Sequence, residues 1–181
     1  MSKLFVISGS SGVGKGTVIK EFLKRNADYK LSVSCTTRNP RAGEVHGENY
    51  FFLTRDEFKA CIERNEFLEW AEFSGNMYGT QRPYIEEKLA QGKNIILEID
   101  TQGALKVKKI MPEAILIFIL PPSFEELEAR LRGRHTETEE AIQKRLESTK
   151  LEMENSKAFD YQVVNDSIEN AVLSLEKIMK I

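Results

Sequence analysis

The stretch that decides the fold is Gly9-Ser10-Ser11-Gly12-Val13-Gly14-Lys15-Gly16-Thr17. It follows an apolar run, Leu4-Phe5-Val6-Ile7, and it precedes apolar residues at helical spacing. A strand, a glycine-rich loop and a helix in this order are the context that a phosphate-binding loop requires. The glycines let successive backbone N–H groups turn towards one point, and the start of the helix adds free donors and a positive dipole end. A plain glycine-rich turn is the alternative, but the spacing of Gly9, Gly14 and Lys15 favours the phosphate-binding loop.

The loop departs from the usual motif directly after its lysine. Lys15 supplies a mobile cation for the outer phosphates, but the next residue is Gly16 where the motif has a serine or threonine that binds Mg²⁺. Thr17 comes one place later and points about 100° further round the helix, so we expect it to meet an inner phosphate. Mg²⁺ would then rest on nucleotide phosphates and waters, with help from a carboxylate elsewhere, which suits an ion that usually keeps several waters. This favours a small nucleotide kinase over a GTPase switch.

Length and composition narrow the class of protein. A chain of 181 residues fits one domain, and its net charge of −2 argues against nucleic-acid binding through bulk charge. The sequence has no signal-peptide pattern and no run of about 18 apolar residues, so we expect no membrane span. Cys35 and Cys61 are too few for a zinc site or a disulfide framework, which fits the reducing cytoplasm. The oligomeric state stays open.

The order of the expected elements predicts an α/β fold. Strands that alternate with helices indicate a parallel sheet with helices on both faces, the core of a P-loop NTPase. Several short strands, including 31–35, 50–53 and 67–73, break this rhythm, and we interpret them as an inserted small α+β subdomain. An arginine-rich segment further on is interpreted as a lid. The expected boundaries are a core at about 1–33, 83–125 and 158–181, an insert at about 34–82 and a lid at about 126–157.

A second set of phosphate-binding side chains is expected in the first loop of the insert. Arginine matches phosphate oxygens as a bidentate fork, and hydroxyls add further donors. A loop of this composition suits a phosphomonoester, although a solvated basic turn is the alternative. The residues are Ser34, Thr36, Arg38, Arg41 and Tyr50.

Glu69 is expected on the inner face of a strand, together with Phe67, Ala71 and Phe73. A carboxylate in that position requires paired donors. The Watson–Crick edge of guanine offers two adjacent N–H donors, whereas adenine presents an acceptor. A buried polar group that the wrong base leaves unpaired can discriminate on the order of 10⁴-fold. The alternative is an edge-strand charge that faces water.

Two acids end a central strand, Glu98 and Asp100. Ligands of open α/β sheets bind beyond the carboxyl ends of the strands. One of the two acids would hold a Mg²⁺-bound water and the other would orient substrate, and the sequence does not decide between them. Capping of the following helix is the alternative, particularly for Asp100.

The lid would supply positive charge to the transferring phosphoryl group on closure and would expel water. A solvated helix face is the alternative, and periodicity does not show which side chains point inward. The arginines in question are Arg130, Arg132, Arg134 and Arg145.

Several linked motifs resemble the guanylate kinase family over nearly the whole chain. The quoted stretches are Ser34-x-x-Thr37-Arg38-x-Pro40-Arg41-x-Gly43-Glu44, Phe67-Leu68-Glu69-Trp70-Ala71, Gly75-Asn76-Met77-Tyr78-Gly79-Thr80, Glu98-Ile99-Asp100-x-Gln102-Gly103, Gly133-Arg134-x-Thr136-Glu137 and Val164-Asn165-Asp166. Ser10, Met77 and His135 differ from the commonest pattern of that family, where proline, tyrosine and glycine are frequent.

The resemblance implies transfer of a phosphoryl group from ATP, as co-substrate, to GMP, giving ADP and GDP with Mg²⁺; dGMP as a second acceptor stays open. It implies closure of the insert and lid over the core. The implied GMP contacts are Ser34, Arg38, Arg41, Tyr50, Glu69, Tyr78, Thr80 and Asp100. The implied catalytic residues are Lys15, Arg38, Arg134 and Arg145, and the implied ATP contacts are residues 9–17, Arg130 and Asn165.

Two rival functions remain to be weighed. The first is a non-catalytic guanylate-kinase-like module that binds phosphopeptides in the GMP site. The intact loop, Lys15 and Ser34 argue against it. The second is a kinase for another phosphate acceptor. Three residues that suit guanine argue against it: Glu69, Thr80 and Asp100.

Overall fold

The computed structural model describes residues 2–10, 12–133 and 139–180, apart from the side chains of Arg130, Leu131, Ala141 and Arg145. The strands are β1 (Leu4–Gly9), β2 (Tyr29–Leu31), β3 (Cys35–Thr36), β4 (Phe51–Phe52), β5 (Phe67–Phe73), β6 (Asn76–Gln81), β7 (Asn94–Glu98), β8 (Ile115–Leu120) and β9 (Tyr161–Val164). The helices are α1 (Lys15–Arg25), α2 (Arg55–Glu63), α3 (Arg82–Ala90), α4 (Thr101–Ile110), α5 (Phe124–Arg132), α6 (Glu139–Asn155), the short 3₁₀ helix η1 (Ser156–Ala158) and α7 (Ile168–Met179).

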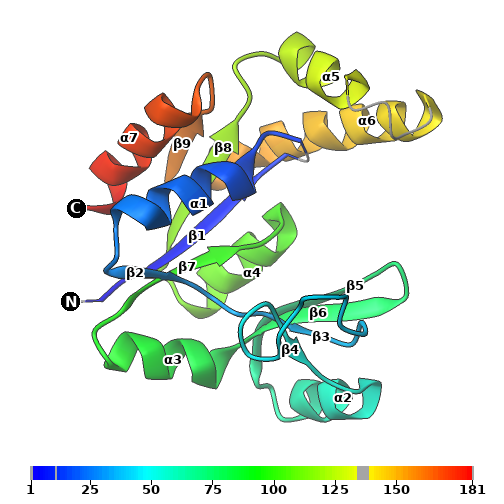
Figure 1. Cartoon of the computed structure of the whole chain (residues 1–181), viewed down its shortest axis with the longest axis vertical. Helices are drawn as coiled ribbons and strands as arrows, with labels where there is room; N and C mark the ends of the chain where they lie inside the picture. The colour runs from blue at the N-terminus through cyan, green and yellow to red at the C-terminus, as the bar shows by residue number, and fades with distance from the viewer. Residues whose placement is uncertain (1, 11, 134–138, 181) are drawn as a thin grey trace.

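The main sheet has five strands in the order β2-β7-β1-β8-β9 (Figure 1). All of its pairings are parallel, which confirms the predicted parallel core. β1 lies in the middle, where Val6 pairs with Leu97 of β7 and Leu116 of β8. The carboxyl ends of β1 and β7 therefore lie next to each other, and the phosphate loop leaves the sheet at this edge.

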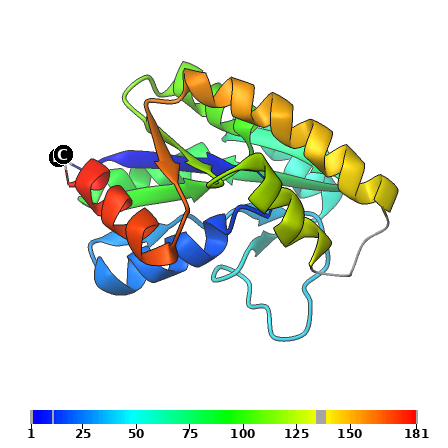
Figure 2. The same cartoon turned by 90° about the horizontal axis from the view of Figure 1, so that it is seen from above.

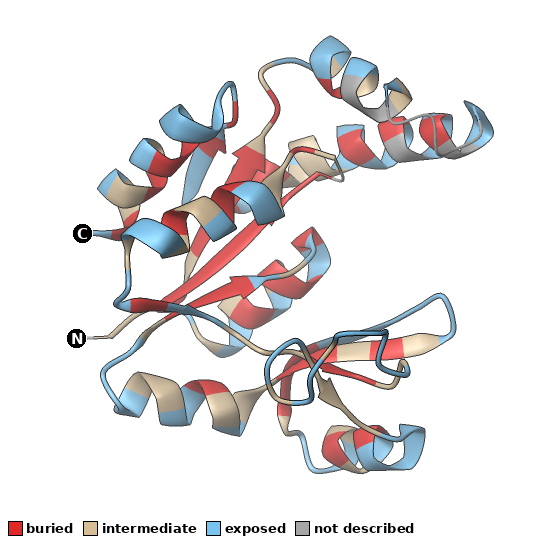
Figure 3. Cartoon of the chain, viewed as in Figure 1, coloured by how far each residue is buried: buried red, intermediate tan, exposed pale blue. Residues whose placement is uncertain are grey.

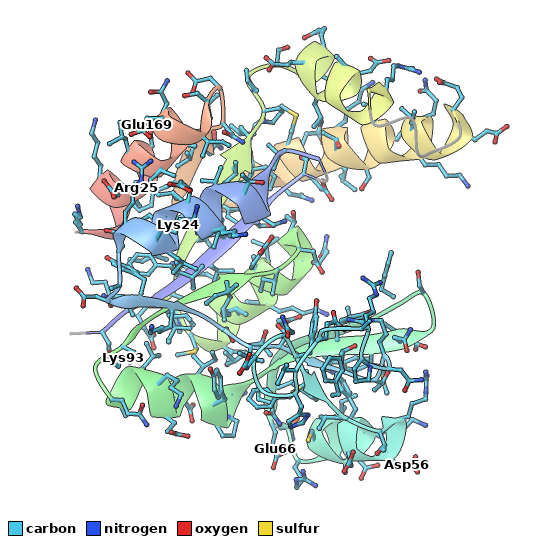
Figure 4. All side chains as sticks on the ribbon, in the orientation of Figure 1. Lys24, Arg25, Asp56, Glu66, Lys93 and Glu169 are labelled. Atoms are coloured by element: carbon cyan, nitrogen blue, oxygen red, sulfur yellow. The ribbon has the colours of Figure 1, made fainter. Side chains whose placement is uncertain are left out.

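Helices cover both faces of this sheet (Figures 1 and 2). Phe5 and Ile7 of β1 pack with residues of α1 and α7, whereas Val6 packs with residues of α3 and α4. This alternation is the period of two that a strand buried on both faces requires. Arg25 and Glu169 join α1 to α7 on the outside, with N–O distances of 2.9 and 2.7 Å, and their side chains point towards each other in Figure 4.

The insert forms a second sheet with the order β4-β3-β6-β5. Its strands pair partly antiparallel, and helix α2 packs against it through a separate small apolar core that contains Phe58 and Phe67. Helix α2 begins with a capping box: the Thr54 side chain accepts from Glu57 N, and the Glu57 carboxylate accepts from Thr54 N. Figure 3 shows the segment that leads from β3 to β4 as mostly exposed.

Two sequence-based expectations for the insert were wrong. The segment 31–35 is not one strand, because β2 ends at Leu31 in the main sheet and β3 begins at Cys35 in the second sheet. In β5, the alternation fails near its start, since a β-bulge lies between Phe67 and Glu69. A bulge sets two residues of one strand opposite one residue of the other, so Phe67 packs in the insert while Leu68 packs against the main core.

The helices α5 and α6 lie between β8 and β9 in the chain and pack together through Leu127, Ile142 and Leu146 (Figure 1). Arg132 binds the carboxylates of Glu128 and Glu139, so this arginine of the segment is paired at the surface. None of the helices in the described ranges combines the length and the apolar composition that a membrane crossing needs.

Candidate active site

The phosphate loop needs glycine at two positions because of close neighbours. A Cβ atom on Gly9 would lie 2.7 Å from the carbonyl oxygen of Ile119 in the adjacent strand. Gly14 has a φ of +90°, and a Cβ there would lie 2.9 Å from Asn165 Nδ2. Both contacts are closer than side-chain atoms tolerate, so the loop geometry explains these two glycines directly.

Helix α1 begins at Lys15 without a side-chain cap, so its first turn keeps backbone N–H groups for a ligand. The carbonyl of Gly14 accepts from Thr17 N and Val18 N, both at 3.1 Å. The Lys15 ammonium donates to the carbonyl of Gly9 at 3.3 Å, which holds the cation over the loop. The loop thus presents an unsatisfied helix N-terminus and a lysine together, the combination that binds phosphate.

Glu98 is the acid on the phosphate-loop side. A Cβ atom on Gly16 would lie 3.6 Å from Glu98 Oε1, so the carboxylate approaches the place where the usual motif carries its hydroxyl. Glu98 also lines a cavity of about 460 Å³ with Lys15 and Thr17, and Asp100 is not among the residues that line it. No group of three metal-ligating side chains forms in the part of the chain that the structure describes, so the donor set fits Mg²⁺ only with phosphate and water as further ligands.

On the other side of the loop, Asn165 donates from Nδ2 to the carbonyl of Val13 at 2.7 Å. The side chain of Val13 is buried in the core, so this residue can meet a ligand only through its backbone. A cavity of about 560 Å³ is lined by the loop glycines Gly12 and Gly14 together with Asn165 and the residues after it. Asn165 therefore supports the loop and also lines the neighbouring cavity.

Glu69 lies in a buried second site. Glu69 is only 8% exposed, and its Oε1 accepts a hydrogen bond from the Thr80 hydroxyl at 2.8 Å. Its Oε2 lies 3.2 Å from the position of a Cβ on Gly103 of α4. Burial raises the pKa of Glu69, the Thr80 bond partly opposes this, and the charge of Asp100 adds to the rise. The water-facing alternative for Glu69 is therefore wrong.

Asp100 fits both interpretations made from the sequence. It is the N-cap of α4, since its Oδ1 accepts from Gly103 N at 2.8 Å. It also lines a cavity of about 370 Å³, which is lined as well by Glu69 and by Leu151 and Glu152 of α6. The two acids at the end of β7 thus belong to different cavities, Glu98 to that of the phosphate loop and Asp100 to that of Glu69.

Aromatic side chains and one acid of the insert gather around Arg38. Its guanidinium lies 5.5 Å from the Tyr50 ring centre and donates to Glu44 Oε1 at 2.8 Å. This pair raises the pKa of Arg38 and lowers the pKa of Glu44. The rings of Tyr50 and Tyr78 lie 6.3 Å apart. The structure therefore brings Arg38, Tyr50 and Tyr78 together, as the sequence led us to expect.

Glu44 is a residue whose role the sequence reasoning missed. Besides binding Arg38, its Oε2 accepts from the backbone N–H of Arg41 at 2.7 Å. It therefore fixes the loop that carries both arginines, although Arg41 itself is exposed. Ser34 adjoins this loop, and its carbonyl accepts from Phe51 N at 2.8 Å. The spacing of an acid three residues after Arg41 is a signal that could have suggested this turn.

Some expected site residues fall outside the described residues. These are Ser11 and Arg134, together with the side chains of Arg130 and Arg145.

The chain has a glycine loop between the central strand of a parallel sheet and a helix, with a second cavity nearby. This arrangement places it among the P-loop nucleoside-triphosphate-binding folds. A family model described as guanylate kinase matches residues 1–181, and the chain belongs to the guanylate kinase family. It is 51% identical over 98% of its length to a guanylate kinase from Synechocystis sp., of which it covers 93%. It is 52% identical over 97% of its length to one from Halalkalibacterium halodurans, of which it covers 86%.

The solved structures agree with this family. The crystal structure of guanylate kinase from Anaplasma phagocytophilum matches with a TM-score of 0.76 at 34% identity, over 99% of this chain and 85% of that one. A shikimate kinase from Bacteroides thetaiotaomicron matches with a TM-score of 0.55 at 16% identity, over 99% of both chains, which shows the shared fold alone.

Proposed function

We propose that the phosphate loop binds ATP and that the cavity around Glu69 binds GMP, so that the two substrates meet at the carboxyl end of the main sheet. The enzyme transfers a phosphoryl group from ATP to GMP and produces ADP and GDP, the reaction of its family. A phosphopeptide-binding module is not favoured, because the relatives at about half identity are enzymes and the loop keeps Lys15.

The observation that carries the choice of acceptor is the buried Glu69 carboxylate. One of its oxygens is occupied by the Thr80 hydroxyl at 2.8 Å, which leaves the other oxygen for a ligand donor. Guanine offers N1–H and N2–H₂ side by side, and Asp100 lines the same cavity. Adenine would bring an acceptor towards these carboxylates, which costs free energy in a buried site.

The phosphate of GMP is assigned to the basic cluster of the insert. Arg38 and Tyr50 lie together beside Tyr78, and Ser34 and Arg41 border the same loop. Arg38 is held by Glu44 at 2.8 Å, so the arginine is oriented before a substrate phosphate replaces or joins that carboxylate. A planar guanidinium then binds two phosphate oxygens at once.

The transfer step relies on positioning and on charge neutralisation. Lys15 neutralises the charge of the transferring group on the ATP side, and Arg38 does so on the acceptor side. Mg²⁺, bound to ATP phosphates and waters near Glu98, supplies further positive charge. Arg134 and Arg145 are assigned the same role from the lid.

The insert at about 34–82 and the lid at about 126–157 are proposed to move relative to the core during the cycle. Apart from Leu68 of β5, which packs in the main core, the buried apolar residues of the insert form a small core of their own, and those of α5 and α6 form another. This suits units that shift as bodies. Closure would remove water that could otherwise accept the phosphoryl group. The buried free thiols of Cys35 and Cys61 suit a reducing compartment, so we place the enzyme in the cytoplasm.

The experiment that tests this function follows ADP formation by the pure protein with ATP, Mg²⁺ and each nucleoside monophosphate in turn, dGMP included. Rapid turnover with GMP and little with AMP, CMP or UMP is the expected result. Rapid turnover with another acceptor would refute the guanine pocket but keep the kinase. Binding of GMP or a phosphopeptide without turnover would instead support the binding module.

A further inference from the structure

Glu152 of α6 is a half-buried acid that the assignments above do not use. It lines the cavity around Glu69 together with Ser148, Leu151 and Asn155, which lie on one face of the helix. Burial raises the pKa of Glu152, and Asp100 adds to this, whereas Ser10 and Lys15 lower it. Glu152 therefore lies within electrostatic reach of two residues of the phosphate loop, Ser10 and Lys15.

Two polar atoms at this junction are buried and unpaired. They are Ser10 Oγ and Glu152 Oε2, and neither makes a hydrogen bond of normal geometry with the residues described. Among the described residues, the other oxygen of Glu152 accepts only from the Ser148 hydroxyl, at a long 3.5 Å. The Ser10 hydroxyl opposes the rise in the pKa of Glu152, so the two groups lie close together, although they form no hydrogen bond of normal geometry. Buried polar atoms that lack partners are costly and call for an explanation.

The two atoms are complementary, because a hydroxyl donates and a carboxylate accepts. A small shift of α6 towards the loop would align them, whereas the present geometry leaves both unsatisfied. Ser10 lies at the turn of the loop, since its carbonyl accepts from Val13 N at 3.2 Å. A bond to its side chain would therefore fix the conformation of the loop from the side of α6.

We propose that Glu152 is a positioning residue for ATP: it accepts a hydrogen bond from the Ser10 hydroxyl in the working enzyme and so couples the lid helix α6 to the phosphate loop. This inference rests on the proposed assignment of the loop as the ATP site. Glu152 acts through Ser10 and touches no reacting atom. A hydrogen bond to a charged group that forms only when the loop is correctly placed strengthens ATP binding and leaves the GMP contacts of Glu69 unchanged.

The experiment is a double-mutant cycle on the KM for ATP at saturating GMP, with Ser10→Ala, Glu152→Ala and the double variant. We expect each single variant to raise this KM by about tenfold, and the double variant to be no worse than the poorer single one. The KM for GMP should change by less than about threefold, a limit just above the deviation of about twofold that distant sites usually show. Glu152→Gln, which keeps a neutral acceptor, should recover part of the loss.

Glu154→Gln is the matched control, because Glu154 lies on the same helix and is exposed; it should behave like the unaltered enzyme. Additive single effects would overturn the inference, and so would an equal rise in the KM for GMP, which would make Glu152 a GMP residue. Melting temperatures show whether a variant is folded, and if Glu152→Ala is not, the cycle is run with Glu152→Gln. If the unaltered protein does not transfer a phosphoryl group from ATP to GMP, the proposed function is refuted. If the enzyme is active but the effects of the two single variants add, only the coupling between Ser10 and Glu152 is refuted.

Discussion

The substitution Glu69→Gln separates recognition of guanine from stability of the fold. The structure fixes how glutamine would sit, because the Thr80 hydroxyl donates to Glu69 Oε1 at 2.8 Å. The carbonyl oxygen of glutamine can keep that bond, and its NH₂ group then takes the place of Oε2. In that position a donor replaces an acceptor, and in the proposed guanine site it would meet the N–H groups of the base.

The magnitude follows from the bonds that change. A hydrogen bond to a charged group contributes about 1.5–3 kcal/mol. Glu69→Gln loses at least one such hydrogen bond and brings the glutamine NH₂ group against a donor of the base. We therefore expect kcat/KM for GMP to fall on the order of 10²-fold, which corresponds to about 3 kcal/mol. The KM for ATP should stay within about twofold, because Glu69 is not among the residues that line either cavity at the phosphate loop.

Stability should move in the opposite direction to activity. Burial raises the folded-state pKa of Glu69 above that of the unfolded chain, so the folded state holds a proton more tightly. Stability is then lost as pH rises from the unfolded pKa through the folded pKa. Glutamine carries no charge, so Glu69→Gln should remove this loss and raise the melting temperature at neutral pH, by about 2–4 °C for each kcal/mol gained.

The assay compares GMP with IMP, which lacks the 2-amino group. The unaltered enzyme should prefer GMP strongly, and Glu69→Gln should narrow that preference. Glu72→Gln is the control, because Glu72 lies on the same strand and is exposed. An unchanged ratio between GMP and IMP, or equal losses for ATP and GMP, would refute the assignment of Glu69 to guanine.

Four further predictions concern the phosphate loop and the insert. Lys15→Ala should lower kcat at least about 10²-fold with an unchanged circular dichroism spectrum, because its cation acts on the transferring charge. Glu98→Gln should raise the Mg²⁺ concentration for half-maximal rate by about tenfold and leave the KM for GMP unchanged. Gly14→Ala should lower the melting temperature by several degrees, since its φ of +90° and the 2.9 Å approach to Asn165 both oppose a side chain. Burial raises the pKa of Cys35 to about 12, so its thiol should react with a disulfide reagent at pH 8 only after urea unfolds the protein.

The sequence was sufficient wherever one local signal determined the structure. The loop from Gly9 to Lys15 could be placed because its glycines follow an apolar strand and open a helix. The start of α2 could be placed because Thr54 and Glu57 satisfy each other's backbone donors. In both cases a few neighbouring residues contain the whole physical reason, so no distant contact can change the outcome.

The sequence was insufficient where the fold divides neighbouring residues between distant partners. Leu31 and Cys35 lie four positions apart but pair in different sheets, and no local pattern marks the change of sheet. Likewise, the bulge in β5 turns both Leu68 and Glu69 towards the core, against simple alternation. The place of Glu152 in the cavity of Glu69 depends on the packing of α6, which the periodicity of that helix does not encode.

The end of β7 explains how one sheet can align two substrates. Glu98 faces the phosphate loop near Gly16, whereas Asp100 caps α4 and lines the cavity of Glu69. β7 is hydrogen-bonded in register to β1, from which the phosphate loop leaves the sheet. The spacing between Glu98 and Asp100 is therefore set by the buried strand β7, and this rigidity matters because misplacement by about 1 Å can cost on the order of 10²-fold in rate. In the proposed function, closure of the insert brings Glu69 towards a substrate that Asp100 already orients at a fixed distance from the phosphate loop.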